Sequence, residues 1–153
     1  MNGTKHDTEA ADFEGREARG DGRDRLSNTS RSAVQHFQQL QVWQKAVELS
    51  VGCYRLTQNF PSEERYGLTS QIRRAAVSVA ANIAEGHARF HTKEFINFLS
   101  MARGSLAELE TLLIIAQKIR LLSEEQLKTT LAQTDEIGRM TAGLRKTLEA
   151  KLS

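Results

Sequence analysis

From Phe37 onward, apolar residues recur every three or four positions, which is the spacing of one face of an α-helix. This pattern predicts four amphipathic helices, at about residues 40–57, 66–85, 92–121 and 124–150. The first helix stops before Pro61, because proline disfavours helical geometry in the residue that precedes it. Four such helices with short connections are typical of an antiparallel up-down four-helix bundle, so the predicted fold class is all-α.

The connections carry signals for the start and the end of helices. Gly86 is expected to end the second helix, since glycine accepts the left-handed conformation just past a helix end without strain. Thr92 is expected to cap the N-terminus of the third helix. Ser123 and Gln126 have the spacing of a capping box, in which each side chain bonds to the backbone of the other residue.

The second predicted helix is small or apolar on nearly every side. Its core-facing positions are Ile72, Ala76, Val79 and Ile83. Other faces carry Val77, Ala80, Ala81 and Ala84. A helix with one buried face should carry charges elsewhere, so these four residues are candidates for a homo-oligomer interface. The alternative is that alanine is only a good helix former and that this surface is unoccupied. Gly104, within the third helix, either packs against another backbone or is an indifferent surface residue.

Residues 1–36 differ from the rest of the chain. Their only large apolar side chains are Met1, Phe13, Leu26 and Val34, among closely mixed charges. Such a segment cannot bury enough apolar surface to offset the entropy lost on ordering, so we predict a disordered tail. The alternative is an arm that folds on a nucleic acid or another partner, although the net charge of this segment is −1.

Charge gives the bundle a different character from the whole chain. The 153 residues have a net charge of +2, but residues 37–153 alone carry 15 basic and 12 acidic side chains. Basic residues gather between positions 65 and 103, where Glu85 and Glu94 are the only acids. Guanidinium groups suit bidentate contacts with phosphate. The candidate nucleic-acid-binding residues are Arg73, Arg74, Arg89, Lys93 and Arg103. Alternatively, these side chains pair with acids, remain solvated or, for Arg73 and Arg74, serve a subunit interface.

Several classes of protein are disfavoured by what the sequence lacks. Cys53, the single cysteine, forms neither an internal disulfide nor a multi-thiolate zinc site, which favours a reduced, cytoplasmic protein. The longest apolar run, residues 112–116, is far shorter than the ~20 residues that span a bilayer. His87 and His91 are four residues apart, but Gly86 places them on a connection as solvated side chains. We therefore expect no cofactor, no metal site, no membrane partner and no enzymatic activity.

Several stretches resemble one known family. They are residues 40–46 (LQVWQKA), 66–76 (YGLTSQIRRAA), 78–86 (SVAANIAEG), 94–99 (EFINFL) and 104–111 (GSLAELET). Together they are similar to the bacterial 23S rRNA intervening-sequence proteins, or S23 family. One departure is Ala80, where the family commonly has a proline that would kink the helix. The resemblance implies a bundle that assembles into a ring, typically a homopentamer. It also implies a relation to the accessory variability protein of diversity-generating retroelements, which binds nucleic acid and a reverse transcriptase.

Two hypotheses about function follow. The first is a non-enzymatic oligomer that binds rRNA, other RNA or DNA through phosphate contacts from a basic surface. The second is a ring-shaped protein–protein adaptor for a nucleic-acid enzyme, without direct nucleic-acid binding. Both require the chain to associate with itself.

Overall fold

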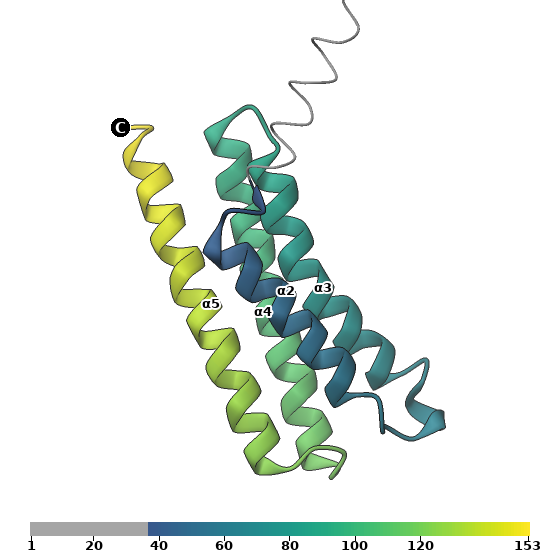
Figure 1. Ribbon diagram of the computed structural model, residues 1–153. Helices are drawn as coiled ribbons and strands as arrows, with labels where there is room; N and C mark the ends of the chain where they lie inside the picture. The colour runs from purple at the N-terminus through teal and green to yellow at the C-terminus, as the bar shows by residue number, and fades with distance from the viewer. Residues whose placement is uncertain (1–36) are drawn as a thin grey trace, which may run out of the picture.

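The computed structural model describes residues 37–153, and it has the all-α fold that the sequence predicts. Its four helices are α2 (Gln41–Leu56), α3 (Leu68–His87), α4 (Thr92–Lys118) and α5 (Glu124–Ala150), with a short 3-10 helix η1 (Ser62–Glu64) between α2 and α3. Figure 1 shows the helices running up and down beside one another. No strand occurs within residues 37–153. The disordered tail predicted for residues 1–36 lies outside the described residues.

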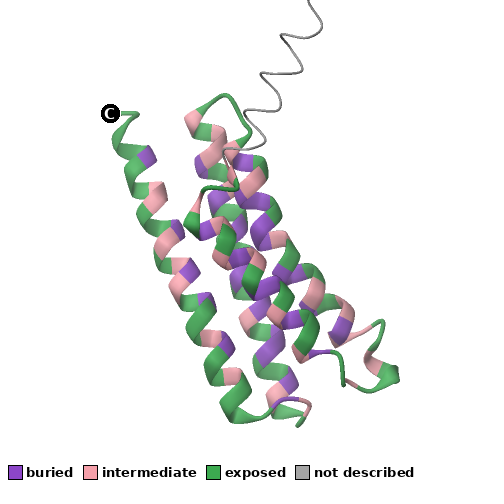
Figure 2. Cartoon of the chain, in the orientation of Figure 1, coloured by how far each residue is buried: buried purple, intermediate pink, exposed green. Residues whose placement is uncertain are grey.

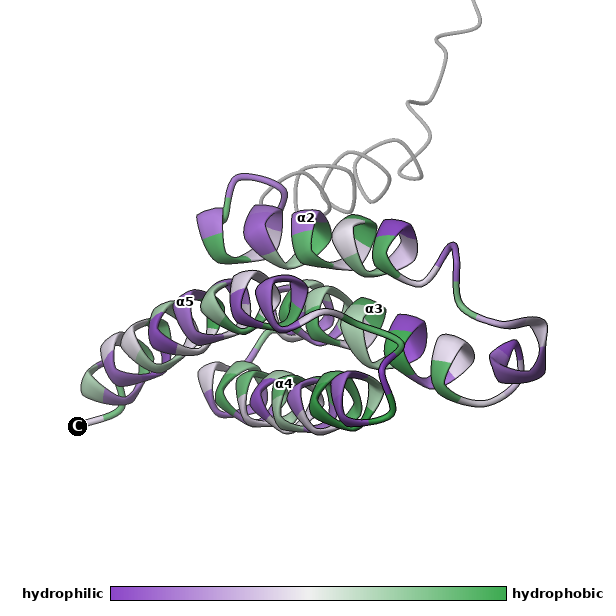
Figure 3. Ribbon diagram, turned by 90° about the horizontal axis from the view of Figure 1, so that it is seen from below, coloured by the Kyte–Doolittle hydropathy of each residue, from purple (hydrophilic) through white to green (hydrophobic). Residues whose placement is uncertain are grey.

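The helices pack around one core. The most extensive contact is between α3 and α4, whereas α2 and α5 touch each other least among the neighbouring pairs. Viewed along the bundle in Figure 3, α2 and α4 lie on opposite sides, with α3 and α5 between them. Buried positions follow the inward faces of the helices in Figure 2. The largest fully buried apolar side chains are Leu49, Ile72, Ile83, Leu99, Leu109, Leu113 and Ile137.

Gly86 does not end α3, so that prediction was wrong. The helix continues through His87, which therefore lies on its last turn and not on the connection. Gly86 is buried, and a Cβ atom there would lie 2.6 Å from Cβ of Phe98 and 2.8 Å from Cδ2 of Phe95. The residue is glycine because α4 approaches the backbone of α3 closely at this point.

The two capping predictions had opposite outcomes. Thr92 is the first helical residue of α4, and the N-cap position belongs to His91, whose side chain makes no capping hydrogen bond. In α5 the capping box is confirmed. The Gln126 backbone N–H donates to Ser123 Oγ at 3.1 Å, and the Ser123 N–H donates to Gln126 Oε1 at 2.9 Å.

Helix α4 ends at Lys118, three residues before the predicted limit of 121, and a tight turn follows it. The Leu121 N–H donates to the Ala116 carbonyl at 2.8 Å, and the Arg120 N–H donates to the Gln117 carbonyl at 2.9 Å. These are the two hydrogen bonds of a Schellman motif. Its left-handed position, usually a glycine, is occupied here by Arg120, with φ at 66°. A side chain in this conformation costs roughly 1–2 kcal/mol, so Arg120 is locally strained.

Candidate interaction surfaces

An apolar groove of about 570 Å³ runs between α2 and α3. We call it the α2–α3 groove. It is lined by Phe37, Trp43, Val47, Ser50, Val51, Tyr54, Val77, Ala80, Ala81 and Ala84. All four interface residues predicted from the sequence are therefore part of one surface. α3 is unbroken across Ala80.

The groove has an apolar floor and apolar walls. Ala80 is only 8 % exposed and belongs to the core, so it forms part of the floor of the groove. Val77 and Tyr54, at 44 % and 48 % exposure, form walls. The Ser50 hydroxyl on the floor is satisfied within the chain, because its one proton is shared between the Ala46 carbonyl, 2.9 Å from Oγ, and the Ala76 carbonyl, 3.0 Å from Oγ. Apolar surface of this kind, concentrated in one place, marks a contact site for another molecule.

The predicted cations do not gather on one surface. Arg73 and Arg74 lie near the start of α3, whereas Arg89 follows its end and Lys93 is in the first turn of α4. Because an α-helix rises 1.5 Å per residue, Arg73 and Arg89 are about 24 Å apart along the bundle. Arg103 lies in the middle of α4. These five residues are therefore close in the sequence but lie at different levels of the bundle.

Two of these arginines are held by contacts within the chain. Arg73 Nε donates to Thr57 Oγ1 at 2.9 Å, and its guanidinium lies 4.6 Å from the centroid of the Tyr54 ring. Arg89 forms an ion pair with Glu85 at 2.8 Å, and its guanidinium lies over the Phe98 ring, 4.8 Å from the centroid. Arg73 thus ties α3 to the end of α2, and Arg89 covers the contact between α3 and α4.

The other three predicted cations differ in their surroundings. Arg103 lines a second groove, of about 370 Å³, between α4 and α5. Its rim also carries Glu110, Asp135 and Arg139, so its charges balance. Arg74 and Lys93 are exposed and make no ion pair with any residue from 37 to 153. Arg103 is also exposed and makes no ion pair in this range, so these three predicted cations remain open to a ligand.

Charge is concentrated at the ends of the bundle. We call residues 55–74 and 115–128, around the α2–α3 and α4–α5 connections, the first end. We call residues 85–98 and 144–153 the second end, and the remainder of the bundle the waist (Figure 1). The first end has seven basic and four acidic residues, and the second end has five basic and three acidic residues. The waist has three basic and five acidic residues. The basic residues of the first end are Arg55, Arg65, Arg73, Arg74, Lys118, Arg120 and Lys128.

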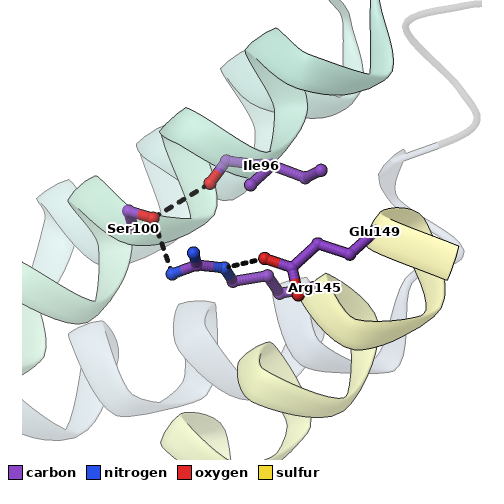
Figure 4. Close-up of polar contacts among 4 residues, drawn as sticks. All are labelled: Ile96, Ser100, Arg145 and Glu149. Atoms are coloured by element: carbon purple, nitrogen blue, oxygen red, sulfur yellow. Dashed lines mark hydrogen bonds and ion pairs between the residues drawn. The ribbon is translucent and has the colours of Figure 1, made fainter. Parts of the chain in front are cut away.

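The ends also differ in how their charges are paired. Four ion pairs occur within residues 37–153, and none of them involves a residue of the first end. At the second end Arg89 is paired with Glu85, and Arg145 Nε donates to Glu149 Oε1 at 2.7 Å. Arg145 also reaches across to α4, where its Nη1 donates to Ser100 Oγ at 3.2 Å (Figure 4). More cations therefore lie outside ion pairs at the first end, where all seven do, than at the second end, where Lys93, Lys146 and Lys151 do.

Sequence reasoning missed most of this first end. Arg55, Lys118, Arg120 and Lys128 come from parts of the chain outside the cluster between positions 65 and 103. The antiparallel order of the helices was a usable signal, since it brings the end of α4 and the start of α5 to the end of the bundle at which α3 begins. The charged surface follows from topology more than from local sequence.

Each end also carries one highly exposed aromatic ring that the sequence analysis did not single out. Tyr66 at the first end is 87 % exposed, and Phe90 at the second end is fully exposed, at 101 %. The Arg65 guanidinium lies 5.7 Å from the centroid of the Tyr66 ring. Both residues lie on connections, where no helical periodicity marks them.

The remaining chemistry of the described part is limited. Among residues 37–153 no three His, Cys, Asp or Glu side chains are grouped so that they could hold a metal ion. The His87 ring packs edge-on against the Phe95 ring, 5.6 Å between centroids. Burial raises the pKa of the Cys53 thiol to about 12, so it stays protonated at neutral pH and acts as a small core residue. None of the helices in this range is long and apolar enough to cross a membrane.

These features define a small helical-bundle protein whose distinctive surfaces are an apolar groove and a basic end. Residues 38–143 match the family described as 23S rRNA-intervening sequence protein, and the chain belongs to this family. A similar solved structure is a protein of unknown function from the S23 ribosomal protein family of Bacteroides thetaiotaomicron VPI-5482. The two share 25 % sequence identity with a TM-score of 0.64, over 69 % of this chain and 95 % of that one. A search of curated proteins gave no match.

Proposed function

We propose that this protein is a non-enzymatic oligomer that binds RNA or DNA through phosphate contacts made by the first end of the bundle. The observation that carries the proposal is the first end itself, where seven basic residues outnumber four acidic ones and none of them belongs to an ion pair with any residue from 37 to 153. Unpaired arginines and lysines are the side chains that replace the counterions of a nucleic acid.

The strained backbone of Arg120 supports the same assignment. Glycine would occupy this left-handed position without strain, yet the chain has a basic side chain there. Strained residues that persist in a fold tend to serve a function, and here the function that fits is a positive charge at the first end.

The α2–α3 groove is suited to be the contact between copies of the chain. Its ten lining residues include nine with apolar side chains or aromatic rings, and a second copy of the chain would remove them from water. A pentamer-like ring would repeat the first end around its axis and so multiply a modest charge into a strong local potential. The name of the matched family and the description of the similar structure both refer to ribosomal components, in agreement with an RNA partner.

The groove also supports a second candidate, the protein–protein adaptor. An apolar helix of a nucleic-acid enzyme could occupy the groove in place of a second copy. In that case the partner should be recovered from cell extract on the immobilised protein after thorough nuclease treatment. Recovery that is abolished by nuclease supports direct nucleic-acid binding instead.

The test of the main proposal is to measure the binding of a labelled 23S rRNA fragment by fluorescence anisotropy at a series of salt concentrations. We expect the logarithm of the affinity to fall linearly with the logarithm of the salt concentration, by roughly 0.9 for each phosphate neutralised on a duplex and roughly 0.7 on a single strand. Absence of binding, or weak binding that salt does not change, would overturn the proposal.

A further inference from the structure

We infer that Tyr66 is a stacking platform for an unpaired base, so that the first end prefers single-stranded nucleic acid to a duplex. This inference rests on the proposed function, and it adds the class of ligand and the residue that selects it. Its starting point is a tyrosine ring that is 87 % exposed although it belongs to an otherwise well-packed domain.

The backbone around Tyr66 is fixed by hydrogen bonds while the ring remains accessible. Before it, the Arg65 N–H donates to the Ser62 carbonyl at 3.1 Å. After it, the Gly67 N–H donates to the Glu64 carbonyl at 3.0 Å, and the Leu68 N–H donates to Glu64 Oε2 at 3.0 Å. The ring is therefore presented from a defined position between η1 and α3, so little backbone order has to be gained when a ligand binds.

One cation adjoins this ring, and a similar pair lies nearby in the sequence. The Arg65 guanidinium lies 5.7 Å from the ring centroid, within the range of a cation–π contact. A second arginine–tyrosine pair, Arg73 and Tyr54, lies at the junction of α2 and α3, where the two groups are 4.6 Å apart. Aromatic rings combined with a basic surface are the arrangement that binds single strands without sequence preference, since every base has a face to stack.

The ligand class follows from what each nucleic acid exposes. In a duplex the faces of the bases are covered by their neighbours, so the Tyr66 ring has no base on which to stack and adds nothing to the phosphate contacts of the cations. In a single strand a base can leave its neighbours and stack on an aromatic side chain. Tyr66 should therefore contribute to single-strand affinity and not to duplex affinity.

Phe90 provides a matched control at the second end. Its ring is fully exposed, but the neighbouring Arg89 is committed to Glu85 and to the Phe98 ring. Glu85 and Glu94 also balance Arg89 and Lys93 in this region. Phe90 thus has the exposure of Tyr66 without uncommitted arginines beside it.

The experiment compares Tyr66→Ala, Tyr66→Leu, Tyr66→Phe and Phe90→Ala by anisotropy, using a labelled single strand of about 12 nucleotides and its duplex. Tyr66 is exposed, so these substitutions leave the core intact. We expect Tyr66→Ala and Tyr66→Leu to lose about 5- to 150-fold in single-strand affinity. Tyr66→Phe and Phe90→Ala should stay within about twofold of the wild type, and duplex affinity should be unchanged in all four.

Three outcomes would overturn the inference. If Tyr66→Leu binds the single strand like the wild type, the contact is hydrophobic and not stacking. If Tyr66→Ala lowers the oligomer mass in light scattering, the ring belongs to a protein contact. If the wild type binds duplex and single strand equally and Tyr66→Ala changes neither, phosphate binding stands without the platform. Failure of the wild type to bind either nucleic acid would instead remove the proposed function as well.

Discussion

Both ends of the bundle have more basic than acidic residues and one highly exposed aromatic ring, yet they use their cations differently. At the second end Arg89 is paired with Glu85, and Arg145 joins Glu149 to Ser100 of α4 (Figure 4). At the first end no ion pair forms within residues 37–153. The comparison teaches that net charge alone does not identify a polyanion surface. What distinguishes the first end is the larger number of cations that lie outside ion pairs, seven against three at the second end.

The waist differs from both ends. It has more acids than bases, and it contains the apolar α2–α3 groove. Self-association and nucleic-acid binding are therefore assigned to surfaces that share no residue and that meet where Tyr54 of the groove contacts Arg73 of the first end. A single substitution can therefore change one surface and leave the other intact.

Ala84→Glu should abolish self-association. Ala84 is half-buried in the groove, so the carboxylate would be desolvated without a partner when a second copy covers it. Burial of an unpaired charge costs several kcal/mol, which is at least about a hundredfold in association. Light scattering on a sizing column should show the mass of one chain. The control is Ala132→Glu, an exposed position of α5. An unchanged mass for Ala84→Glu would show that the groove is not the interface.

Gly86→Ala should destabilise the fold by about 1–3 kcal/mol, because the added methyl would overlap Phe98 and Phe95 at 2.6 and 2.8 Å. The matched control is Gly104→Ala, where no atom lies within 4 Å of the new Cβ. That change should stabilise the fold by up to about 1 kcal/mol, since glycine is unfavourable within a helix. Urea denaturation measures both. Equal effects of the two substitutions would contradict the close approach of α4 to α3 at Gly86.

Arg120→Gly should separate stability from binding. Removing the side chain relieves the left-handed strain and should raise the free energy of unfolding by about 1 kcal/mol. It also removes one cation of the first end, so the salt dependence of RNA affinity should become shallower by about 0.7 on a single strand. Arg120→Lys keeps both the strain and the charge and should change neither property. Stability that falls in Arg120→Gly would argue against strain at this turn.

The fold was accessible from the sequence because helical periodicity and the capping box are local signals. Gly86 was misread because a helix-ending glycine and a close-contact glycine look alike until the position of Phe98 is known. The cations were misread for a related reason, since a 20-residue helix carries Arg73 and Arg89 to opposite ends. Arg120 and Tyr66 had no pattern to mark them, because connections lack periodicity. The pairing of Arg89 with Glu85 has the i,i+4 spacing of a helical ion pair, which was a usable signal in the sequence. The contact of Arg73 with Tyr54 joins two helices and has no such signal.

The most direct test of the account is the RNA affinity of two single charge reversals, Arg74→Glu at the first end and Lys93→Glu at the second. Both side chains are exposed, and neither makes an ion pair within residues 37–153, so the variants differ chiefly in location. The account predicts that Arg74→Glu weakens binding by about tenfold and lowers the salt slope, while Lys93→Glu stays within about twofold of the wild type. Equal losses in both variants, or a larger loss in Lys93→Glu, would contradict it.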